Sequence, residues 1–595
     1  MDFLLFDWLK AEQLCERERF SAHSRETIEA VLDLSMRLGR EAYLPHYRKS
    51  DQIEPYLDGD RVHVLPEAGE ALRQLANSGL PGASFDERLG GQQLPSVVSS
   101  AWLGILMAAN TATAAFTMLS MANARLIATF GTPRQIEIFA RPQIEGRWMG
   151  TMCLSEPQAG SGLGDILTRA TPDGQDELGA RYRLRGNKMW ISGGDHEVSE
   201  NIVHLVLAKL PDESGRLPDG TRGISLFIVP KWLDRNGGRT RNDVVVAGLN
   251  HKMGYRGISN CLLNFGEGRF TPDRHSGAVG YLVGELGQGL PIMFQMMNEA
   301  RIAVGLDAAM LAMRARHLSS SYARERLQGR HRGYCHGAKM APIIHHSDVK
   351  RMLLAQKSYA EGALALVFYA SKLVDEEPTT TDAEASAETS DLLSLLTPIA
   401  KTWPSEFGLE ATDLAIQIHG GYGYTRDFDV EQLHRDNRLN PIHEGTTGIQ
   451  ALDLVGRKII KDGGRSLRIL GRRVTETASA ASAIPELASF AQRLDSVWTG
   501  LQDCCRALME HDRNAALSNA TMILRATGHV VVGWQWLDQC VAAHLCSGER
   551  GKRLFREKTA VCRYFFEYEI PKVDAWLEMA RPGNDLFETV DPDLL

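Results

Sequence analysis

The composition of the chain changes twice along its length, and these changes constrain the fold more than any other feature. Residues 2–147 place apolar side chains at helical spacing, as in 27–44. Residues 148–285 contain short β-rich runs separated by Gly, Asp, Asn and Pro, and helical composition then returns. Gly463-Gly464 and Pro485 interrupt the last helical region. The pattern predicts an α+β protein with four domains: 1–147, 148–285, 286–462 and 463–595.

The β-rich region contains the clearest strand candidates. They lie at 149–154, 182–185, 202–207, 224–229, 244–246 and 261–265. The short runs and frequent turns predict a compact domain of antiparallel strands.

The charge, the cysteine spacing and the first ten residues argue against several classes of protein. The net charge of −8 argues against a protein built to bind nucleic acid or an anionic membrane. The nine cysteines form no C-x-x-C pair, so neither a disulfide framework nor a zinc site is expected. The first ten residues have no basic region before their apolar residues, unlike a signal peptide. These features predict a cytoplasmic protein.

Three segments have simple structural interpretations. Residues 94–124 carry no charge, but Asn110, Asn123 and many small polar residues favour buried helices over an integral membrane segment. Residues 375–391 are acidic and rich in small residues, which predicts a mobile surface loop between helices. His345-His346 with Asp348 lacks further spaced ligands, so no metal site is expected.

The segment 417–450 contains residue types suited to cofactor binding and catalysis. It contains a glycine-rich turn, then Glu444, and then a helix for which Thr446 or Thr447 is the expected N-cap. Glycines let the backbone approach a phosphate-bearing cofactor closely, and a carboxylate at this point suits proton abstraction. Taken alone, Glu444 fits better as an ordinary acidic residue at a helix start, favoured there by the helix dipole.

Two motifs in the β-rich region join a strand to a predicted turn. They are C-L-S-E-P-Q-A-G-S-G at 153–162 and K-M-W-I-S-G-G at 188–194. Turns of this kind present backbone N–H groups and hydroxyls to an acceptor. Trp190 would stack on a planar ring and Ser192 would donate to a ring nitrogen. Each motif alone also fits a hairpin turn with one core tryptophan.

Together, the order and spacing of these motifs resemble the flavin-dependent acyl-CoA dehydrogenase family over about residues 20–462. The extra length resembles the family's larger branch, which includes 3-methylmercaptopropionyl-CoA dehydrogenase-like and long-chain enzymes. The resemblance implies an N-terminal α-helical domain, a middle antiparallel β domain, a C-terminal four-helix-bundle domain and an additional α-helical domain. It also implies FAD as cofactor and a homodimer, because the added domain often occupies the surface used for tetramer formation.

The resemblance assigns roles to individual residues. Glu444 would be the catalytic base. The FAD contacts would be Met152, Leu154, Ser155, Trp190, Ser192, Arg326, Gln328, Gln417, Gly420, Gly421 and Thr446. The acyl-CoA contacts would be Ser161, Asn298, Arg301 and Gly445. Arg326, Gln328 and Gln417–Gly421 would serve the FAD of a neighbouring subunit, whereas Thr446 would contact the FAD of its own.

The implied reaction converts a medium- or long-chain fatty acyl-CoA to trans-2-enoyl-CoA in fatty acid β-oxidation. Glu444 would remove the α-proton while a hydride leaves the β-carbon for flavin N5. The thioester carbonyl would be bound by the backbone N–H of Glu444 and a ribityl hydroxyl of FAD. Exclusion of water would raise the pKa of the carboxyl toward the working pH. The electrons would pass to an electron-transfer flavoprotein.

Departures from the family pattern leave alternatives open. Gly162, Leu327-Gln328-Gly329 and Gly448 differ from the usual residues, which puts the details of FAD binding in doubt. Glu299 and Glu406 are the next candidate bases. An acyl-CoA oxidase would share the fold and use O2. A DNA-associated relative would need a basic C-terminal face, but residues 461–595 hold 17 basic against 18 acidic residues.

Overall fold

The computed structural model describes residues 1–235, 238–330, 339–510, 513–581 and 586–595. The chain forms two compact units, which are named here the β unit and the helical unit. The β unit comprises Glu29–Leu94 and Ile105–Ala300. The helical unit comprises Met1–Ile28, Pro95–Gly104 and Arg301–Leu595. The four domain ranges expected from the sequence stay a prediction.

The N-terminal region is mostly helical, as predicted. Its principal helices are α1 (Arg25–Leu38), α2 (Tyr47–Gln52), α3 (Pro66–Asn77) and α4 (Ser96–Phe130), followed by α5 (Pro133–Gln135) and α6 (Arg141–Ile144). The prediction omitted one element: the hairpin of β1 (Tyr56–Asp58) and β2 (Arg61–His63). The turn between these strands contains Gly59 at φ 57°, a left-handed backbone that favours glycine.

The segment without charges forms α4. Within the described part of the chain, α4 is the one helix long and apolar enough to cross a membrane. Its most apolar 18-residue window is 78% buried in the fold. Asn110 interrupts the helical backbone with φ −159° and ψ 95°, and its side-chain oxygen accepts from the N–H of Thr113 at 3.3 Å. These features agree with the prediction of a helix buried in protein.

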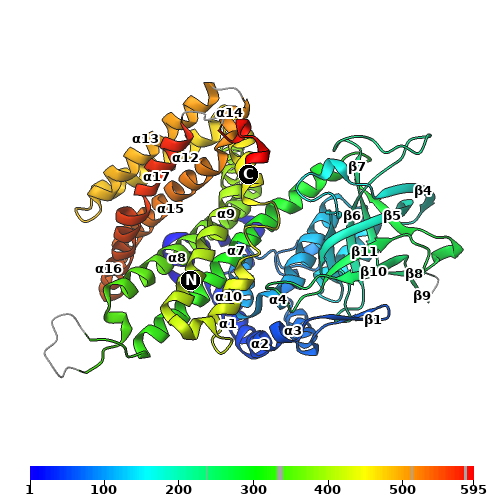
Figure 1. Cartoon of the computed structure of the whole chain (residues 1–595), viewed down its shortest axis with the longest axis horizontal. Coiled ribbons are helices and arrows are strands. Elements are labelled where there is room, and N and C mark those ends of the chain that lie inside the picture. The colour runs from blue at the N-terminus through cyan, green and yellow to red at the C-terminus, as the bar shows by residue number, and fades with distance from the viewer. Residues whose placement is uncertain (236–237, 331–338, 511–512, 582–585) are drawn as a thin grey trace. The chain divides into compact units, whose positions relative to one another are not determined.

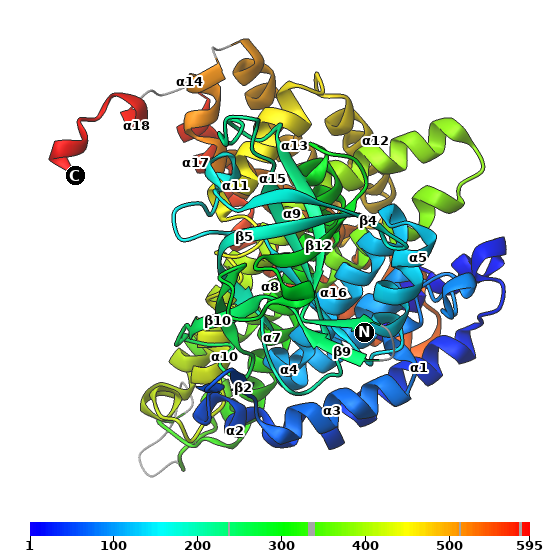
Figure 2. The ribbon, with the colours of Figure 1, turned by 90° about the vertical axis from the view of Figure 1, so that its right-hand side faces the viewer.

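The eight-stranded sheet organises the β unit. Its strands are β3 (Met149–Cys153), β4 (Arg169–Asp176), β5 (Gly179–Ser192), β6 (Ile202–Lys209), β7 (Ile224–Pro230), β10 (Val244–Leu249), β11 (Asn260–Phe265) and β12 (Ala278–Val283). The order is β10-β11-β5-β12-β7-β6-β3, and β4 pairs with β5 and β6. Figure 2 shows β4, β5 and β12 side by side. All side chains of β6 and β7 are buried, because both faces of this part of the sheet are covered.

The prediction of antiparallel strands is confirmed for most pairs of this sheet but is wrong for two of them. β3 pairs with β6 in parallel from Met149↔Ile202 to Cys153↔Val206, and Arg169 of β4 pairs in parallel with Lys209 of β6. The physical reason lies in the connection: about fifty residues separate the starts of β3 and β6, which is long enough for the chain to cross over. The remaining pairs in this sheet are antiparallel.

The second motif of the β region lies in a strand and not in the predicted turn. β5 continues through Lys188 to Ser192, and the turn follows at Gly193. Cys261 of β11 pairs with Ile191, but Leu263 pairs with Lys188, so two residues of β5 face one residue of β11. This is a β-bulge at Met189-Trp190, and Trp190 adopts φ 65° within it.

Long helices form the bundle of the helical unit. They are α7 (Gly289–Glu325), of which the part from Arg301 belongs to this unit, α8 (Ser347–Glu376) and α9 (Ala383–His419). Shorter helices follow as α10 (Val430–Asn437) and α11 (Thr447–Leu452), which continues as a π-helical segment, Asp453–Ile460. α8 and α9 pack along each other and bury an apolar surface that includes Leu366, Phe368, Leu395 and Ile399.

The predicted C-terminal appendage is helical. It contains α12 (Arg465–Ser482), α13 (Ala488–Glu510), α14 (Arg513–Ser518), α15 (Ala520–Leu545), α16 (Gly548–Tyr564), α17 (Pro571–Ala580) and α18 (Leu586–Thr589). The buried α15 packs against α12, α13, α16 and α17, and also against α8, α9 and α11 of the bundle (Figure 1). The contact with the bundle includes a buried polar network: the carboxylate of Glu569 accepts from Tyr359 of α8 at 2.9 Å and contacts His529 of α15 at 3.4 Å.

The prediction of a mobile loop at 375–391 is wrong. α8 runs to Glu376, a short 3-10 helix follows at Glu377–Thr379, and α9 begins at Ala383. The side chain of Asp382 caps α9 by accepting from the N–H of Ala385 at 2.8 Å. Asp375 is buried and accepts from the N–H groups of Ser96 and Val97 at 2.6 and 3.0 Å. The segment is therefore a helical connection whose first acidic residue holds the start of α4.

Candidate active site

The loop between α10 and α11 carries Glu444 in an unusual backbone conformation. Glu444 has φ 52° and Gly445 has φ 87°, so two successive residues occupy the left-handed region. A non-glycine residue in this region stores backbone strain, and such strain is concentrated at functional sites. The amide of Gln450 supports the conformation by donating to the Glu444 carbonyl at 3.0 Å. A Cβ at position 445 would lie 2.5 Å from Nε2 of Gln450, so only glycine fits there.

Thr446 begins the helix, as one of the two predicted caps. Its hydroxyl faces the N–H of Ile449 at 3.5 Å. Along this helix Leu452 is 44% exposed, whereas Val455 is buried. The buried face of this segment instead includes Gln450, Ala451, Leu454 and Val455, because a polar contact from Gln450 to the loop takes one of the inward positions.

Glu444 is half-buried. Burial raises its pKa above the usual value of 4.5, and the positive charges of Lys401 and Arg301 act in the opposite direction. The described residues place no cation within 4 Å of this carboxylate. The imidazole of His443 is held neutral, because burial and the charge of Lys401 lower its pKa to about 3. Glu444 thus combines restricted hydration with freedom from a direct ion pair.

Lys401 is a residue of this site that the sequence analysis missed. It lies in the middle of α9 with 0% exposure, and its ammonium donates to the carbonyl of Asn440 at 2.7 Å. Burial lowers its pKa to about 8, against the opposing effect of Glu444. The sequence could have indicated Lys401 because it is the single cation within the mostly apolar segment 399–403, but the sequence gives no indication of its partner.

Arg301, a predicted acyl-CoA contact, is 4% exposed and forms a buried ion pair with Asp453, with Nη1 and Oδ2 2.9 Å apart. The other predicted substrate residue on α7, Asn298, is exposed and belongs to the β unit. The structure thus places Arg301 in the same unit as Glu444 and Gly445.

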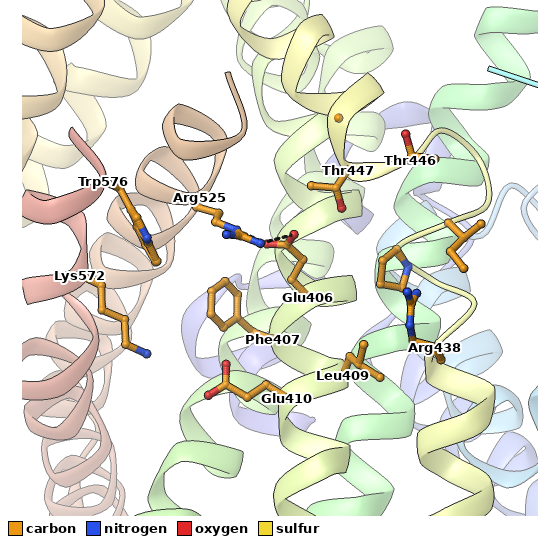
Figure 3. A pocket seen from close by; sticks show the side chains of 13 residues that line it. Glu406, Phe407, Leu409, Glu410, Arg438, Thr446, Thr447, Arg525, Lys572 and Trp576 are labelled. Atoms are coloured by element: carbon orange, nitrogen blue, oxygen red, sulfur yellow. Dashed lines mark hydrogen bonds and ion pairs between the residues drawn. The ribbon is translucent and has the colours of Figure 1, made fainter. Parts of the chain in front are cut away.

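Both alternative bases form ion pairs with arginines. Glu406 accepts from Arg525 at 2.9 and 3.2 Å, and Glu299 lies 3.0 Å from Arg125. Figure 3 shows Glu406 in contact with Arg525, and both residues line a pocket of about 710 Å³. The pocket wall includes Ile442 and Thr446, which flank Glu444 in sequence, and Lys572 and Trp576 of α17. Burial raises the pKa of Glu299 as it does that of Glu444, so the ion pairs with arginine are what distinguish the two alternative carboxylates from Glu444.

The glycine turn of the helical unit lies beside Arg326. The Arg326 guanidinium lies 5.5 Å from the ring centre of Tyr422, which belongs to the turn Gly420–Tyr424. Gln417, Gly420 and Gly421 are exposed, and a Cβ on either glycine would meet no atom within 4 Å. The structure therefore brings Arg326 and the turn together at a surface.

Gln328 lies on the strand-like bridge between Leu327 and Pro342. Its carbonyl accepts from Nε2 of His346 at 2.7 Å. The described residues contain no group of three His, Cys, Asp or Glu side chains that would hold a metal ion.

In the β unit, the residues after β3 lie beside the bulge of β5. The carbonyl of Ser155 accepts from the N–H of Met189 at 3.0 Å. Lys188 is 0% exposed and donates to the Leu154 carbonyl at 3.0 Å and to the Glu156 carboxylate at 2.9 Å. Glu156 also accepts from the N–H groups of Leu167 and Thr168 at 2.7 and 3.0 Å. This buried pair, also missed from the sequence, fixes the loop that contains Leu154 and Ser155.

The bulge turns Trp190 outward, and its side chain is 59% exposed. Ser192 pairs with Asn260 of β11, whose amide donates to the Ser192 hydroxyl at 3.2 Å. Met152 is partly buried against the apolar core, whereas Ser161 is exposed. The structure thus gathers Leu154, Ser155, Trp190 and Ser192 at one end of β5.

Comparison with known families accounts for most of the chain. The acyl-CoA dehydrogenase N-terminal domain matches residues 49–147, the middle domain matches 151–267 and the C-terminal domain matches 287–460. The family described as acetyl-CoA dehydrogenase C-terminal like matches residues 470–590.

Two curated relatives and one solved structure are similar to this chain over most of its length. The 3-methylmercaptopropionyl-CoA dehydrogenase of Ruegeria pomeroyi is 35% identical over 539 residues, covering 89% of this chain and 87% of that protein. The broad-specificity linear acyl-CoA dehydrogenase FadE5 of Mycobacterium tuberculosis is 30% identical over 621 residues, covering 100% of this chain and 97% of that protein. An acyl-CoA dehydrogenase from Bacillus anthracis, solved in complex with FAD, has a TM-score of 0.74 at 20% identity, covering 100% of this chain and 93% of that chain.

The matched domains cover the ranges that contain Glu444, the bulge of β5 and the glycine turn. The chain belongs to the acyl-CoA dehydrogenase family, with the acyl-CoA dehydrogenase fold plus additional C-terminal helices, and is an FAD-dependent oxidoreductase that acts on CH–CH bonds.

Proposed function

We propose that this chain oxidises a medium- or long-chain fatty acyl-CoA to trans-2-enoyl-CoA in fatty acid β-oxidation, with Glu444 as the base. The observation that carries the proposal is the state of Glu444. The residue is half-buried, its pKa is raised by burial, and no cation of the described chain lies within 4 Å of its carboxylate. A general base works best when its pKa lies close to the working pH.

The backbone around Glu444 supports binding of a thioester. Among the described residues, the N–H of Glu444 has no hydrogen-bond acceptor. A donor that is free and held by a strained backbone is suited to the oxygen on which negative charge develops when the α-proton leaves. We therefore assign to Glu444 both the proton transfer and, through its N–H, part of the stabilisation of the enolate.

The residues expected around the cofactor fit FAD. Trp190 presents an exposed ring from a rigid bulge, and aromatic faces stack on planar ring systems. Gly420 and Gly421 leave open space where a side chain would otherwise stand, as close approach of a diphosphate requires. Bound FAD supplies the hydride acceptor, at N5 of its ring. The proposed contacts are Met152, Leu154, Ser155, Trp190, Ser192, Arg326, Gln328, Gln417, Gly420, Gly421 and Thr446.

The chain orients and polarises the substrate. We propose Ser161, Asn298, Arg301 and Gly445 as the acyl-CoA contacts. Gly445 adjoins the proposed base, and a Cβ there would lie 2.5 Å from Nε2 of Gln450 at a φ of 87° that side chains rarely adopt. Exclusion of water by the acyl chain would raise the pKa of Glu444 further and prevent loss of the transferred hydride to side reactions.

A panel of straight-chain acyl-CoAs of graded length, assayed with an artificial electron acceptor, tests the proposal. We expect the highest kcat/KM for a medium or long chain and trans-2-enoyl-CoA as the product. Activity restricted to a branched or sulfur-containing acyl group would contradict the fatty acyl assignment. An acyl-CoA oxidase is the second candidate. It predicts stoichiometric peroxide release in air, whereas we expect reoxidation by an electron-transfer flavoprotein.

The assembly and location are also proposals. We expect a cytoplasmic homodimer. The dimer is expected because α12, α15 and α16 of the C-terminal region pack on α8, α9 and α11 and cover bundle surface that would otherwise be available to another subunit. The molar mass measured by light scattering separates a dimer from a tetramer.

A further inference from the structure

Lys401 is a buried cation close to the proposed base, and its placement is specified by the packing of α9 against α7. A Cβ at Gly305 of α7 would lie 1.9 Å from the Ala400 carbonyl, so the two helices are in backbone contact one residue before Lys401. Pro404 lacks the N–H that would normally bond to the Ala400 carbonyl, which removes one helical hydrogen bond at this point. The position of Lys401 is thus tied to rigid helix backbone.

The ammonium group of Lys401 holds the loop that leads to Glu444. It donates to the Asn440 carbonyl at 2.7 Å. The Asn440 side chain is 0% exposed and donates to Asp307 of α7 at 2.8 Å, which leaves its oxygen to accept from Nε2 of His443 at 3.1 Å. A chain of buried hydrogen bonds therefore runs from Lys401 to the residue directly before Glu444.

The other charges near Glu444 are largely compensated. Arg301 of α7 is paired with Asp453 at 2.9 Å. Glu406 of α9 is paired with Arg525, whereas Asp307 accepts from the neutral amide of Asn440 and keeps its charge. His443, on the loop itself, is neutral because its pKa is lowered to about 3. The ammonium group of Lys401 differs from these ion-paired groups, because its polar contact in the described structure is a neutral carbonyl.

We propose that Lys401 is a positioning residue for the reaction, which holds the 440–444 loop and favours the ionised form of Glu444 without pairing with it. This inference rests on the proposed role of Glu444 as base. The cation opposes the desolvation of the carboxylate before substrate binds, so that the enzyme enters the reaction with the base deprotonated. A direct ion pair would favour ionisation more strongly but would weaken the base, which explains why the ammonium bonds to a backbone carbonyl instead.

The test is the pH dependence of kcat/KM for an acyl-CoA substrate in the FAD-loaded full-length enzyme, for the wild type and for Lys401→Met, Lys401→Gln and Lys401→Arg. Loss of the charge in Lys401→Met is expected to move the acid limb of the profile to higher pH. With kcat/KM of each enzyme divided by its own plateau value, the variant should be about tenfold lower than the wild type at a pH on the limb. Lys401→Arg keeps the charge and is expected to restore the position of the limb. Lys401→Gln retains a donor for the Asn440 carbonyl without charge, so it should shift the limb even if Lys401→Met does not fold.

The control variant is Lys458→Met. Lys458 is a half-buried lysine of the same unit that donates to Ser394 at 2.6 Å, and its replacement is expected to leave the limb unchanged. An unshifted limb in both uncharged variants, with a uniform loss of activity at every pH, would mean a structural role only and would overturn the inference. Glu444→Gln separates the two assignments: full turnover in that variant would overturn the base and the role of Lys401 together, whereas an inactive Glu444→Gln with an unshifted Lys401 limb would overturn Lys401 alone.

Discussion

Two buried lysines of this protein have contrasting relationships with a carboxylate. Lys188 of the β unit and Lys401 of the helical unit are both 0% exposed. Lys188 bonds directly to Glu156 at 2.9 Å, and that carboxylate also accepts two backbone N–H groups. Lys401 bonds to the backbone carbonyl of Asn440, and its charge reaches the Glu444 carboxylate without a direct hydrogen bond.

The consequence is opposite pKa shifts for the two carboxyl groups. The charge of Lys188 and the backbone donors hold the pKa of Glu156 below its usual value, despite burial. Burial holds the pKa of Glu444 above its usual value, despite Lys401. Direct pairing makes Glu156 a fixed structural anchor, whereas the separated charge leaves Glu444 able to accept a proton. The same residue type thus fixes a loop at one site and, in the proposed mechanism, adjusts the base at the other.

The largest expected effect comes from Glu444→Gln. The amide preserves the size of the side chain and removes the base, so kcat should fall by about a thousandfold or more. FAD binding and the melting temperature should remain close to those of the wild type, because no ion pair is lost. Glu406→Gln is the matched control: it removes a carboxylate that is already paired with Arg525, and we expect activity within a few-fold of the wild type.

Lys188→Met is expected to act on stability. Removing one partner of a buried ion pair leaves the other charge uncompensated, at a cost of about 3–5 kcal/mol in the free energy of unfolding. Urea denaturation followed by circular dichroism measures this loss, which should be partly recovered in Lys188→Met/Glu156→Leu. Equal stability of Lys188→Met and wild type would show that the two lysines do not differ in the way described.

The pH dependence of kcat/KM in the wild type tests the raised pKa of Glu444, which distinguishes it from Glu156. Glu444 must be ionised to act, and its pKa is raised, so kcat/KM should decline on the acid side with a midpoint above pH 4.5. Below that midpoint the rate should fall tenfold for each pH unit. A profile that stays flat down to pH 4.5 would mean that the pKa of the base is not raised as the structure indicates.

A smaller effect is expected for Trp190→Ala. The side chain is mostly exposed, so the free energy of unfolding should change by less than about 0.5 kcal/mol. Loss of stacking should weaken FAD binding by about tenfold, measured by titration of the apoprotein. The similarly exposed Tyr56 of β1 offers a control, since Tyr56→Ala removes a 58% exposed aromatic ring outside the proposed contacts.

The sequence was sufficient to locate most strands and helices, because local periodicity and turn residues encode them. It did not reveal the bulge at Trp190, since a bulge is a property of the pairing between β5 and β11. The parallel pair β3–β6 depends on topology for the same reason. The helical start at Ala383 was predictable in principle, because Asp382 is a good N-cap and Ala and Glu favour helix.

The candidate site was predicted only in part. Glu444, Thr446 and the glycine turn were accessible because they form contiguous motifs. Lys401 was not, because its partner Asn440 is 39 residues away and only the packed bundle brings them together. Lys188 lies inside a recognised motif, but its function as the partner of Glu156 depends on the register of β5 beside the loop after β3.

The most direct test of the central claim, that Glu444 removes the α-proton, is anaerobic single-turnover reduction of the enzyme-bound flavin by an acyl-CoA substrate. Stopped-flow absorbance near the flavin maximum should show rapid bleaching of the wild type. In Glu444→Gln we predict that substrate still binds and perturbs the flavin spectrum, but that bleaching slows by about a thousandfold or more. Bleaching of Glu444→Gln at a rate close to that of the wild type would contradict the account.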